Sequence, residues 1–138
     1  MVLDQAWALT SDFTIASLKG ASLFSTQFRD AKLDGANFEG ARVAADFSRA
    51  SRKGANFKDA DMKNQSMGLM RGVFRSTDLE GASFENANMA RVVLEYARLR
   101  GANLRDANLM GSELAGADLT GADVALSLIH ISEPTRPY

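Results

Sequence analysis

Large apolar residues recur at every fifth position along most of the chain. From residue 11 onward a small residue, usually alanine, lies two places before each of them, as in Ala36-Asn37-Phe38. A period of five matches neither the 3.6-residue period of an α-helix nor the two-residue period of a flat strand. It predicts a chain that turns a corner every five residues and sends one large and one small side chain inward on each side.

The other three positions of each step carry nearly all the charge, so we expect them to face water. Glycine often falls just before the small residue, where a corner needs backbone torsions that glycine adopts easily. These positions are Gly20, Gly35, Gly40, Gly54, Gly81, Gly101, Gly116 and Gly121.

The segments read Ala-(Asn/Asp)-(Leu/Phe)-X-X over residues 11–125, and in this the chain resembles the pentapeptide-repeat family. The resemblance implies an all-β fold, a right-handed four-sided parallel β-helix with twenty residues per coil. For this length it implies about five to six coils, roughly 25–30 Å long at a strand spacing of about 4.8 Å. We therefore divide the chain into a short N-terminal cap (1–10), the β-helix (11–125) and a tail (126–138).

Charges twenty residues apart support this coil length independently, because such residues would stack on neighbouring coils. Opposite signs meet at this separation in Asp12–Lys32, Lys19–Glu39, Arg75–Glu95, Glu80–Arg100, Glu85–Arg105 and the column Asp78–Arg98–Asp118. The one like-charge pair is Arg71 over Arg91. An exposed pair contributes only about 0–1 kcal/mol, so buried apolar residues should supply the stability. The predicted core residues are Leu79, Phe84, Leu99, Leu104, Leu109 and Leu119.

The five-residue register slips twice. The step from Val43 to Phe47 is one residue short, and the step from Met62 to Leu69 is two residues too long. The second slip is either a bulge or a loop that presents a binding surface. Methionine fills irregular core gaps and also lines adaptable surfaces, and here core filling is the favoured interpretation. The candidate interaction residues at this slip are Lys63, Gln65, Met67, Met70 and Arg71.

Three local features depart from the repeat. Arg52 occupies an inward position, and since a buried unpaired arginine is very costly, we expect the coil to be distorted and Arg52 to turn out to solvent. Residues 1–10 predict a short amphipathic helix that covers the open end of the solenoid with Trp7. Residues 126–138 resemble the translation of a sequencing-library adapter. We therefore expect the natural protein to continue past residue 125, and we give His130, the only histidine, no functional weight.

Composition narrows the possible functions. The 138 residues include no cysteine, which excludes disulfides, thiol nucleophiles and thiolate metal sites, and the formal net charge is −1. No apolar run approaches the ~18–20 residues of a membrane span. Glycines are spread through corners rather than gathered in a phosphate-binding loop. We predict no catalytic activity, no cofactor or metal, and no small-molecule substrate. The expected protein is soluble, either cytoplasmic or, if photosynthetic in origin, in the thylakoid lumen.

The sequence therefore predicts a structural scaffold or protein–protein interaction module, with neither the partner nor the oligomeric state specified. The family resemblance implies two alternatives. Some members mimic DNA and inhibit or protect DNA gyrase, a topoisomerase, but that needs a continuous acidic face and the signs here alternate. Others are thylakoid-lumen proteins of unassigned role. A nucleic-acid binder using the basic segment 42–75 is a further class, but it lacks interleaved outward aromatics.

Overall fold

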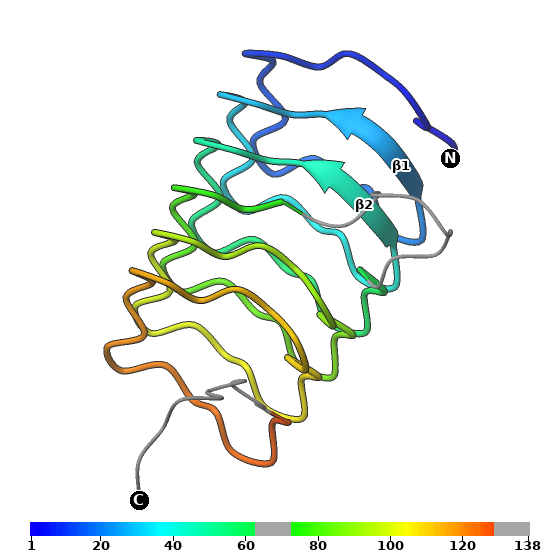
Figure 1. The fold of residues 1–138 in the computed structure, drawn as a ribbon. Helices are drawn as coiled ribbons and strands as arrows, with labels where there is room; N and C mark the ends of the chain where they lie inside the picture. Colours follow the sequence, from blue (N-terminus) through cyan, green and yellow to red (C-terminus); the bar gives the residue numbers. More distant parts are fainter. Residues whose placement is uncertain (63–72, 129–138) are drawn as a thin grey trace, which may run out of the picture.

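The structure is a computed structural model that describes residues 1–62 and 73–128. In it the chain winds as a stack of coils (Figure 1). Strands β1 (Ser22–Gln27) and β2 (Arg42–Asp46) form a two-stranded parallel sheet, and the remaining sides pair through isolated parallel bridges. The strands are short because a corner follows every five residues. No helix occurs within the described residues. The all-β solenoid implied by the family resemblance is confirmed.

Residues twenty apart stack on one another over most of the chain, as Asp12 does on Lys32 and Asp78 on Arg98. The large inward residue that follows each bridge residue donates its N–H to the next coil, so that Leu99 N–H binds the Asp118 carbonyl at 2.8 Å. These ladders build four inward columns. They are Leu3, Leu23, Val43, Met62, Met89 and Leu109; Ala8, Phe28, Phe47, Phe74, Leu94 and Leu114; Phe13, Leu33, Arg52, Leu79, Leu99 and Leu119; and Leu18, Phe38, Phe57, Phe84, Leu104 and Val124.

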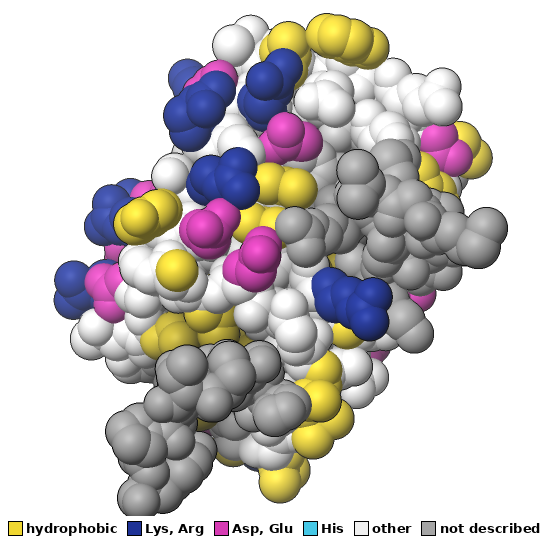
Figure 2. Space-filling model, in the orientation of Figure 1, with side chains coloured by type: hydrophobic (Ala, Val, Ile, Leu, Met, Phe, Trp, Pro, Cys, Tyr) yellow, Lys and Arg dark blue, Asp and Glu magenta, His cyan; other side chains and the backbone are white. Residues whose placement is uncertain are grey.

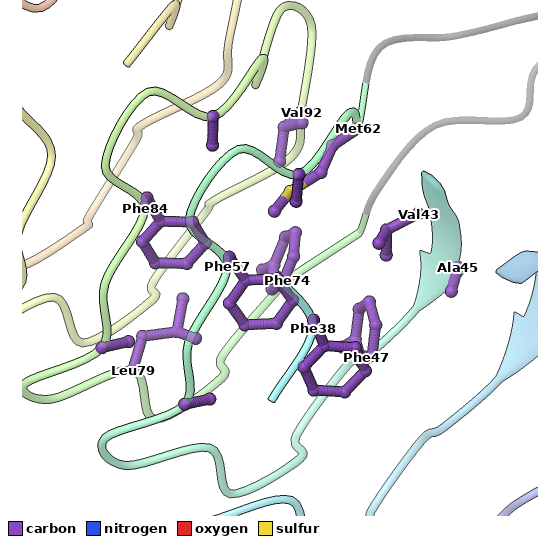
Figure 3. Close-up of a cluster of buried hydrophobic side chains, with 14 of the residues drawn as sticks. Phe38, Val43, Ala45, Phe47, Phe57, Met62, Phe74, Leu79, Phe84 and Val92 are labelled. Carbon is purple, nitrogen blue, oxygen red and sulfur yellow. The ribbon is translucent and has the colours of Figure 1, made fainter. Parts of the chain in front are cut away.

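Phenylalanines dominate the middle of the core (Figure 3). Within one column the Phe47 and Phe74 rings stack with centroids 5.0 Å apart, and in another the Phe57 and Phe84 rings do so at the same distance. Between the columns the rings meet edge to face, as Phe57 and Phe74 do at 5.9 Å. Each such pair contributes about 0.5–1.5 kcal/mol beyond the area it buries, so the aromatic columns bind successive coils together.

Nearly every corner of the described chain contains a residue with a positive φ, two places after the inward residue. Glycine fills this position nine times, with φ between 66° and 71°, so the predicted role of the corner glycines is confirmed. At other corners an ordinary residue takes the left-handed conformation, including the β-branched Ile15 with a φ of 54°. A polar residue before the inward position closes many corners, as where Asn37 Oδ1 accepts the Glu39 N–H at 2.9 Å.

The first register slip lies in β2. Leu23 pairs with Val43 and Gln27 with Asp46, with an irregularity between them because β2 lacks one corner residue. No residue of β2 has a positive φ, so this corner forms without the left-handed turn. The bridges that follow join residues nineteen apart, such as Lys32 and Ser51, which agrees with the one-residue deficit seen in the sequence.

The second slip is larger than the sequence indicated. Asp46 pairs with Val73, and Asp61 pairs with Asn88, which are separations of 27 residues rather than 20. The twelve-residue step from Met62 to Phe74 therefore takes the place of a single five-residue step. The predicted excess of two residues is wrong, because 27 minus 20 leaves seven. Leu69, which the pattern counted as a separate inward step, lies outside the described residues.

The two ends of the described chain follow the same ladder. Val2 pairs with Ser22 and Trp7 with Gln27, so the helix expected over residues 1–10 is wrong. The Trp7 side chain is 78% exposed and does not cover the core. At the other end Asn108 pairs with Leu128, so residues 126–128 continue the stack. The rest of the tail, with His130, lies outside the described residues.

Candidate interaction surface

One side of the solenoid carries a charge on nearly every coil, and we call it the charged face. Its residues flank the inward column that contains Arg52 and Leu99. The bridge residues are Asp12, Lys32, Ser51, Asp78, Arg98 and Asp118, and the residues that follow the inward column are Thr14, Asp34, Lys53, Glu80, Arg100 and Thr120. Because successive side chains of an extended chain alternate between the two sides of the backbone, both sets point to solvent.

Charge on this face is arranged in bands, each of which lies along a single coil. One coil carries basic Lys53, the next acidic Asp78 and Glu80, the next basic Arg98 and Arg100, and the last acidic Asp118. The next side of the solenoid repeats the same signs in the same order, with Lys58, Glu85, Arg105 and Asp123. The sequence showed the alternation along each column, but we missed that neighbouring columns share one sign within a coil. The available signal was Asp78-x-Glu80 followed twenty residues later by Arg98-x-Arg100.

The bands contact one another only loosely within the chain. Lys53 Nζ lies 3.6 Å from Asp78 Oδ2, and the Arg98 guanidinium lies 4.0 Å from Asp78 and 3.9 Å from Glu80. The side chains of Lys53, Glu80 and Arg98 remain at least half exposed. Exposed pairs of this kind contribute little to stability, so these groups keep most of their capacity to bind a second surface.

Several charge pairs predicted from the twenty-residue spacing are formed. Arg75 and Glu95 lie 2.9 Å apart and Lys19 and Glu39 3.9 Å apart, on sides other than the charged face. Glu80, expected opposite Arg100, instead lies near Arg98.

Glu85 and Arg105, which were expected opposite each other, have other partners. Glu85 accepts a hydrogen bond from Asn103 Nδ2 at 3.4 Å, and Arg105 pairs with Asp123 at 3.3 Å. Arg71, expected to stack over Arg91, lies outside the described residues. On the surface shown in Figure 2, basic and acidic side chains lie next to one another rather than in separate fields.

Local hydrogen bonds favour the ionised form of two acidic residues of the charged face, Asp118 and Asp12. The Thr120 hydroxyl donates to Asp118 Oδ1 at 2.6 Å and the Thr120 N–H donates to the same oxygen at 3.0 Å. These bonds, together with the positive charges of Arg100 and Arg98, lower the pKa of Asp118 below its usual range. Thr14 lowers the pKa of Asp12 in the same way, with a smaller contribution from Lys32. Asp118 and Asp12 therefore stay negative at neutral pH.

A ridge of glycines borders the charged face at the corner that follows it. A Cβ atom added to Gly54, Gly81 or Gly101 would meet no other atom within 4 Å. Since these corners carry no side chain and stand in open space, the backbone itself forms the edge of the face. A second protein could approach this edge closely without meeting bulky groups.

Arg52 lies directly beneath the charged face, and the expectation that it turns out to solvent is wrong. Its side chain is fully buried, and Nε and both terminal nitrogens lack a hydrogen-bond partner. The backbone enforces this orientation, because Ser51 pairs with Asp78 and the Arg52 N–H donates to the Asp78 carbonyl at 2.9 Å. A residue that follows a bridge residue in this ladder points inward, whatever its chemistry.

Four aromatic rings surround the buried guanidinium. Its central carbon lies 3.6 Å from the centroid of Phe47 and 3.9 Å from that of Phe57, with Phe38 and Phe74 just under 5 Å away. The negative faces of these rings attract the cation and recover part of the desolvation cost. Burial still lowers the pKa of Arg52 well below its ordinary value. The group reaches no solvent, so it belongs to the core and not to the interaction surface.

The residues singled out in the sequence fall into two groups. The predicted interaction residues Lys63, Gln65, Met67, Met70 and Arg71 lie outside the described residues. The residues assigned to the core are placed inward: Leu79, Phe84, Leu99, Leu104 and Leu109 are at most 2% exposed, while Leu119 is partly buried.

Within residues 1–62 and 73–128, no three His, Cys, Asp or Glu residues come together in a way that could hold a metal ion. The same part of the chain contains no helix long and apolar enough to cross a membrane.

Both the repeat sequence and the fold are similar to those of known proteins. The sequence profile described as pentapeptide repeats matches eight copies, in residues 11–42, 73–106 and 87–124. No curated protein matches the sequence. The solved pentapeptide repeat protein Rfr23 from the cyanobacterium Cyanothece 51142 is 21% identical with a TM-score of 0.61, covering 92% of this chain and 86% of that chain. A trypsin-treated form of QnrB1, a plasmid-mediated fluoroquinolone resistance protein, is 19% identical with a TM-score of 0.61, covering 92% of this chain and 69% of that chain. At these identities the likeness shows the fold alone.

Proposed function

The chain belongs to the pentapeptide-repeat family, and we propose that it serves as a rigid scaffold that binds another protein through the charged face. The observation that carries this proposal is the banding of four successive coils of that face, where the sign of the charge alternates from the coil of Lys53 to the coil of Asp118. The proposal requires neither catalysis nor a cofactor.

The fold supports this role by holding the bands in fixed positions. Inward columns such as Leu79 and Leu99 are fully buried, and every coil is joined to the next by backbone hydrogen bonds on all four sides. A partner therefore meets charges at a regular spacing of about 4.8 Å along the axis. Complementary charge across such a surface gives specificity and fast association more than raw affinity.

Affinity capture with three versions of the chain tests the proposal. The first is the wild type, the second is the double variant Asp78→Lys/Glu80→Lys on the charged face, and the third is a matched control on another side, Arg75→Glu/Glu95→Arg. The control exchanges the two members of a 2.9 Å ion pair and so retains it. We expect the wild type and the control to capture the same proteins, and the charged-face variant to capture at least tenfold less of them. A captured set that is identical for all three versions would count against the charged face.

DNA mimicry is a weaker alternative for this surface. A chain that imitates DNA needs an acidic face without interruption, whereas Arg98 and Arg100 lie between the acidic bands of the charged face. We expect the protein to leave DNA supercoiling by gyrase unchanged at micromolar concentration, and potent inhibition would favour the alternative. A nucleic-acid binder is tested by a gel shift at low salt, where we expect no shift.

A further inference from the structure

We propose that the charged face packs against the charged face of a second copy of this chain, with the two solenoid axes antiparallel, to form a symmetric dimer at low ionic strength. The inference rests on the proposed function, since it uses the same face, and it specifies the partner. It follows from how the bands of charge map onto themselves under two-fold symmetry.

Two symmetric arrangements bring one charged face against another. If the two-fold axis runs along the solenoid, every coil faces the same coil of the other copy, and each band meets a band of its own sign. That arrangement is repulsive throughout. If the axis runs across the solenoid, the order of the coils is reversed in the second copy, and the bands that meet depend on where the axis lies.

An axis between the Asp78 coil and the Arg98 coil makes the four bands from Lys53 to Asp118 complementary. Asp78 then faces Arg98 of the second copy, and Glu80 faces its Arg100. One coil further out, Lys53 lies beside Asp118 of the second copy. Symmetry repeats each contact, so the acidic and basic bands of both chains are all matched. This match requires the sequence of signs plus, minus, plus, minus over four successive coils, which Lys53, Asp78, Arg98 and Asp118 supply.

The groups that would meet are available for such contacts. The Arg98 side chain is 57% exposed and its intramolecular partners lie 3.9 to 4.0 Å away, a distance that leaves room for shorter bonds to a second carboxylate. Asp78 is more enclosed, with a side chain 20% exposed, but it lies at the centre of the face. The glycine corners at Gly81 and Gly101 have open space around them, so nothing at this edge keeps two faces apart.

The dimer should be weak and sensitive to salt. One side of a five-residue solenoid is narrow, and its area falls below that of a standard protein–protein interface. Exposed ion pairs contribute little individually, and salt at 0.5 M screens charges beyond roughly 4 Å. Association should therefore be measurable at about 20 mM salt and lost at 0.5 M.

Sedimentation velocity with two complementary variants tests the arrangement. The variant Asp78→Lys/Glu80→Lys makes the Asp78 band basic, like the Arg98 band beside it. The variant Arg98→Glu/Arg100→Glu makes the Arg98 band acidic, like the Asp78 band. Each variant alone therefore repels a second copy of itself. In an equimolar mixture the basic bands of one face the acidic bands of the other. We expect the wild type to associate at low salt, each variant to associate at least tenfold more weakly, and the mixture to recover association. The control Arg75→Glu/Glu95→Arg should associate like the wild type.

Several results would overturn the proposal. They are a wild type whose sedimentation coefficient stays constant with concentration at low salt, a mixture that remains monomeric, or single variants that still associate. If a charge-reversed variant does not fold, the neutral pair Asp78→Asn/Glu80→Gln and Arg98→Gln/Arg100→Gln replaces it, and each neutral variant should also weaken association. A monomeric wild type that still captures a protein through the charged face would refute the dimer alone and leave the proposed function in place.

Discussion

Replacing Arg52 with leucine should make the protein more stable. The guanidinium is fully buried and its three nitrogens have no hydrogen-bond partner. Each buried polar atom left unpaired costs about 1–3 kcal/mol, so the three nitrogens cost roughly 3–9 kcal/mol. The contacts with the faces of Phe47 and Phe57 return about 2 kcal/mol or somewhat more. The balance remains unfavourable by a few kcal/mol.

Leucine removes this cost and suits its neighbours in the column. Arg52 stacks between Leu33 and Leu79, both fully buried, so a leucine would continue an apolar column. The smaller side chain leaves some empty volume, which costs about 1 kcal/mol. Replacing buried charged groups with apolar ones has stabilised other proteins by about 1–4 kcal/mol. We expect an increase of that size in the free energy of unfolding, and a melting temperature higher by about 3 °C or more per kcal/mol.

Urea unfolding followed by circular dichroism measures the effect, with Arg52→Met and Arg52→Lys as companions. Methionine fills the same length without charge and should also stabilise the chain. Lysine keeps the charge but loses the flat stacking on Phe47 and Phe57, so it should be less stable than the wild type. If both Arg52→Leu and Arg52→Met unfold at lower urea concentration than the wild type, the account of an unpaired buried charge is refuted.

Three further changes test the packing and the electrostatics. Leu99→Asp places a carboxylate in the core, where the leucine alone contributes about 1.5–3 kcal/mol, and should unfold the surrounding coils; an unchanged melting temperature would refute the inward position. Gly116→Ala puts a Cβ 2.5 Å from Tyr96 Cδ1 at a φ of 70°, and should cost about 1–3 kcal/mol, with Tyr96→Ala restoring part of it in the double variant. Since the pKa of Asp118 is lowered in the fold, the unfolded chain takes up that proton first as the pH falls. The free energy of unfolding should be constant near pH 6 and decline below pH ~4, less steeply in Asp118→Asn than in the wild type. An equally steep decline in both proteins would contradict the lowered pKa of Asp118.

The five-residue period predicted the inward columns because it depends only on the backbone. A residue after a bridge residue points inward, and this holds for Leu99 and Phe84 as for Arg52. The expectation for Arg52 failed because the cost of burying charge was given more weight than the ladder, and the surrounding phenylalanines could not be placed from the sequence. The helix expected at the N-terminus failed for a related reason. Leu3 and Ala8 also keep the five-residue spacing, but in ten residues this spacing resembles an amphipathic helix.

The size of the second slip could not be read from the sequence. Leu69 has a spacing of five from Phe74, so a repeat count accepts it as an inward step. Only the pairing of Asp61 with Asn88, 27 residues apart, shows that the chain from Met62 to Phe74 replaces one step. Spacing along a sequence cannot distinguish a side of the solenoid from a loop with apolar residues, whereas hydrogen bonds between coils can.

The charge bands are a feature that the fold does not require. On the next side of the solenoid the ladder forms with uncharged residues at the bridge positions Asn37, Asn56 and Asn103, while the charges of that side lie mainly after the inward column. Compensation within one chain would be best if Asp78 and Glu80, which lie on the same coil, had opposite signs, and likewise Arg98 and Arg100. Placing like charges side by side costs energy within the chain, while it concentrates one sign where another surface can meet it. The arrangement of charges thus favours binding to another surface over ion pairing within the chain. Because the sign alternates over four successive coils, it favours a second copy of the chain as the binding partner.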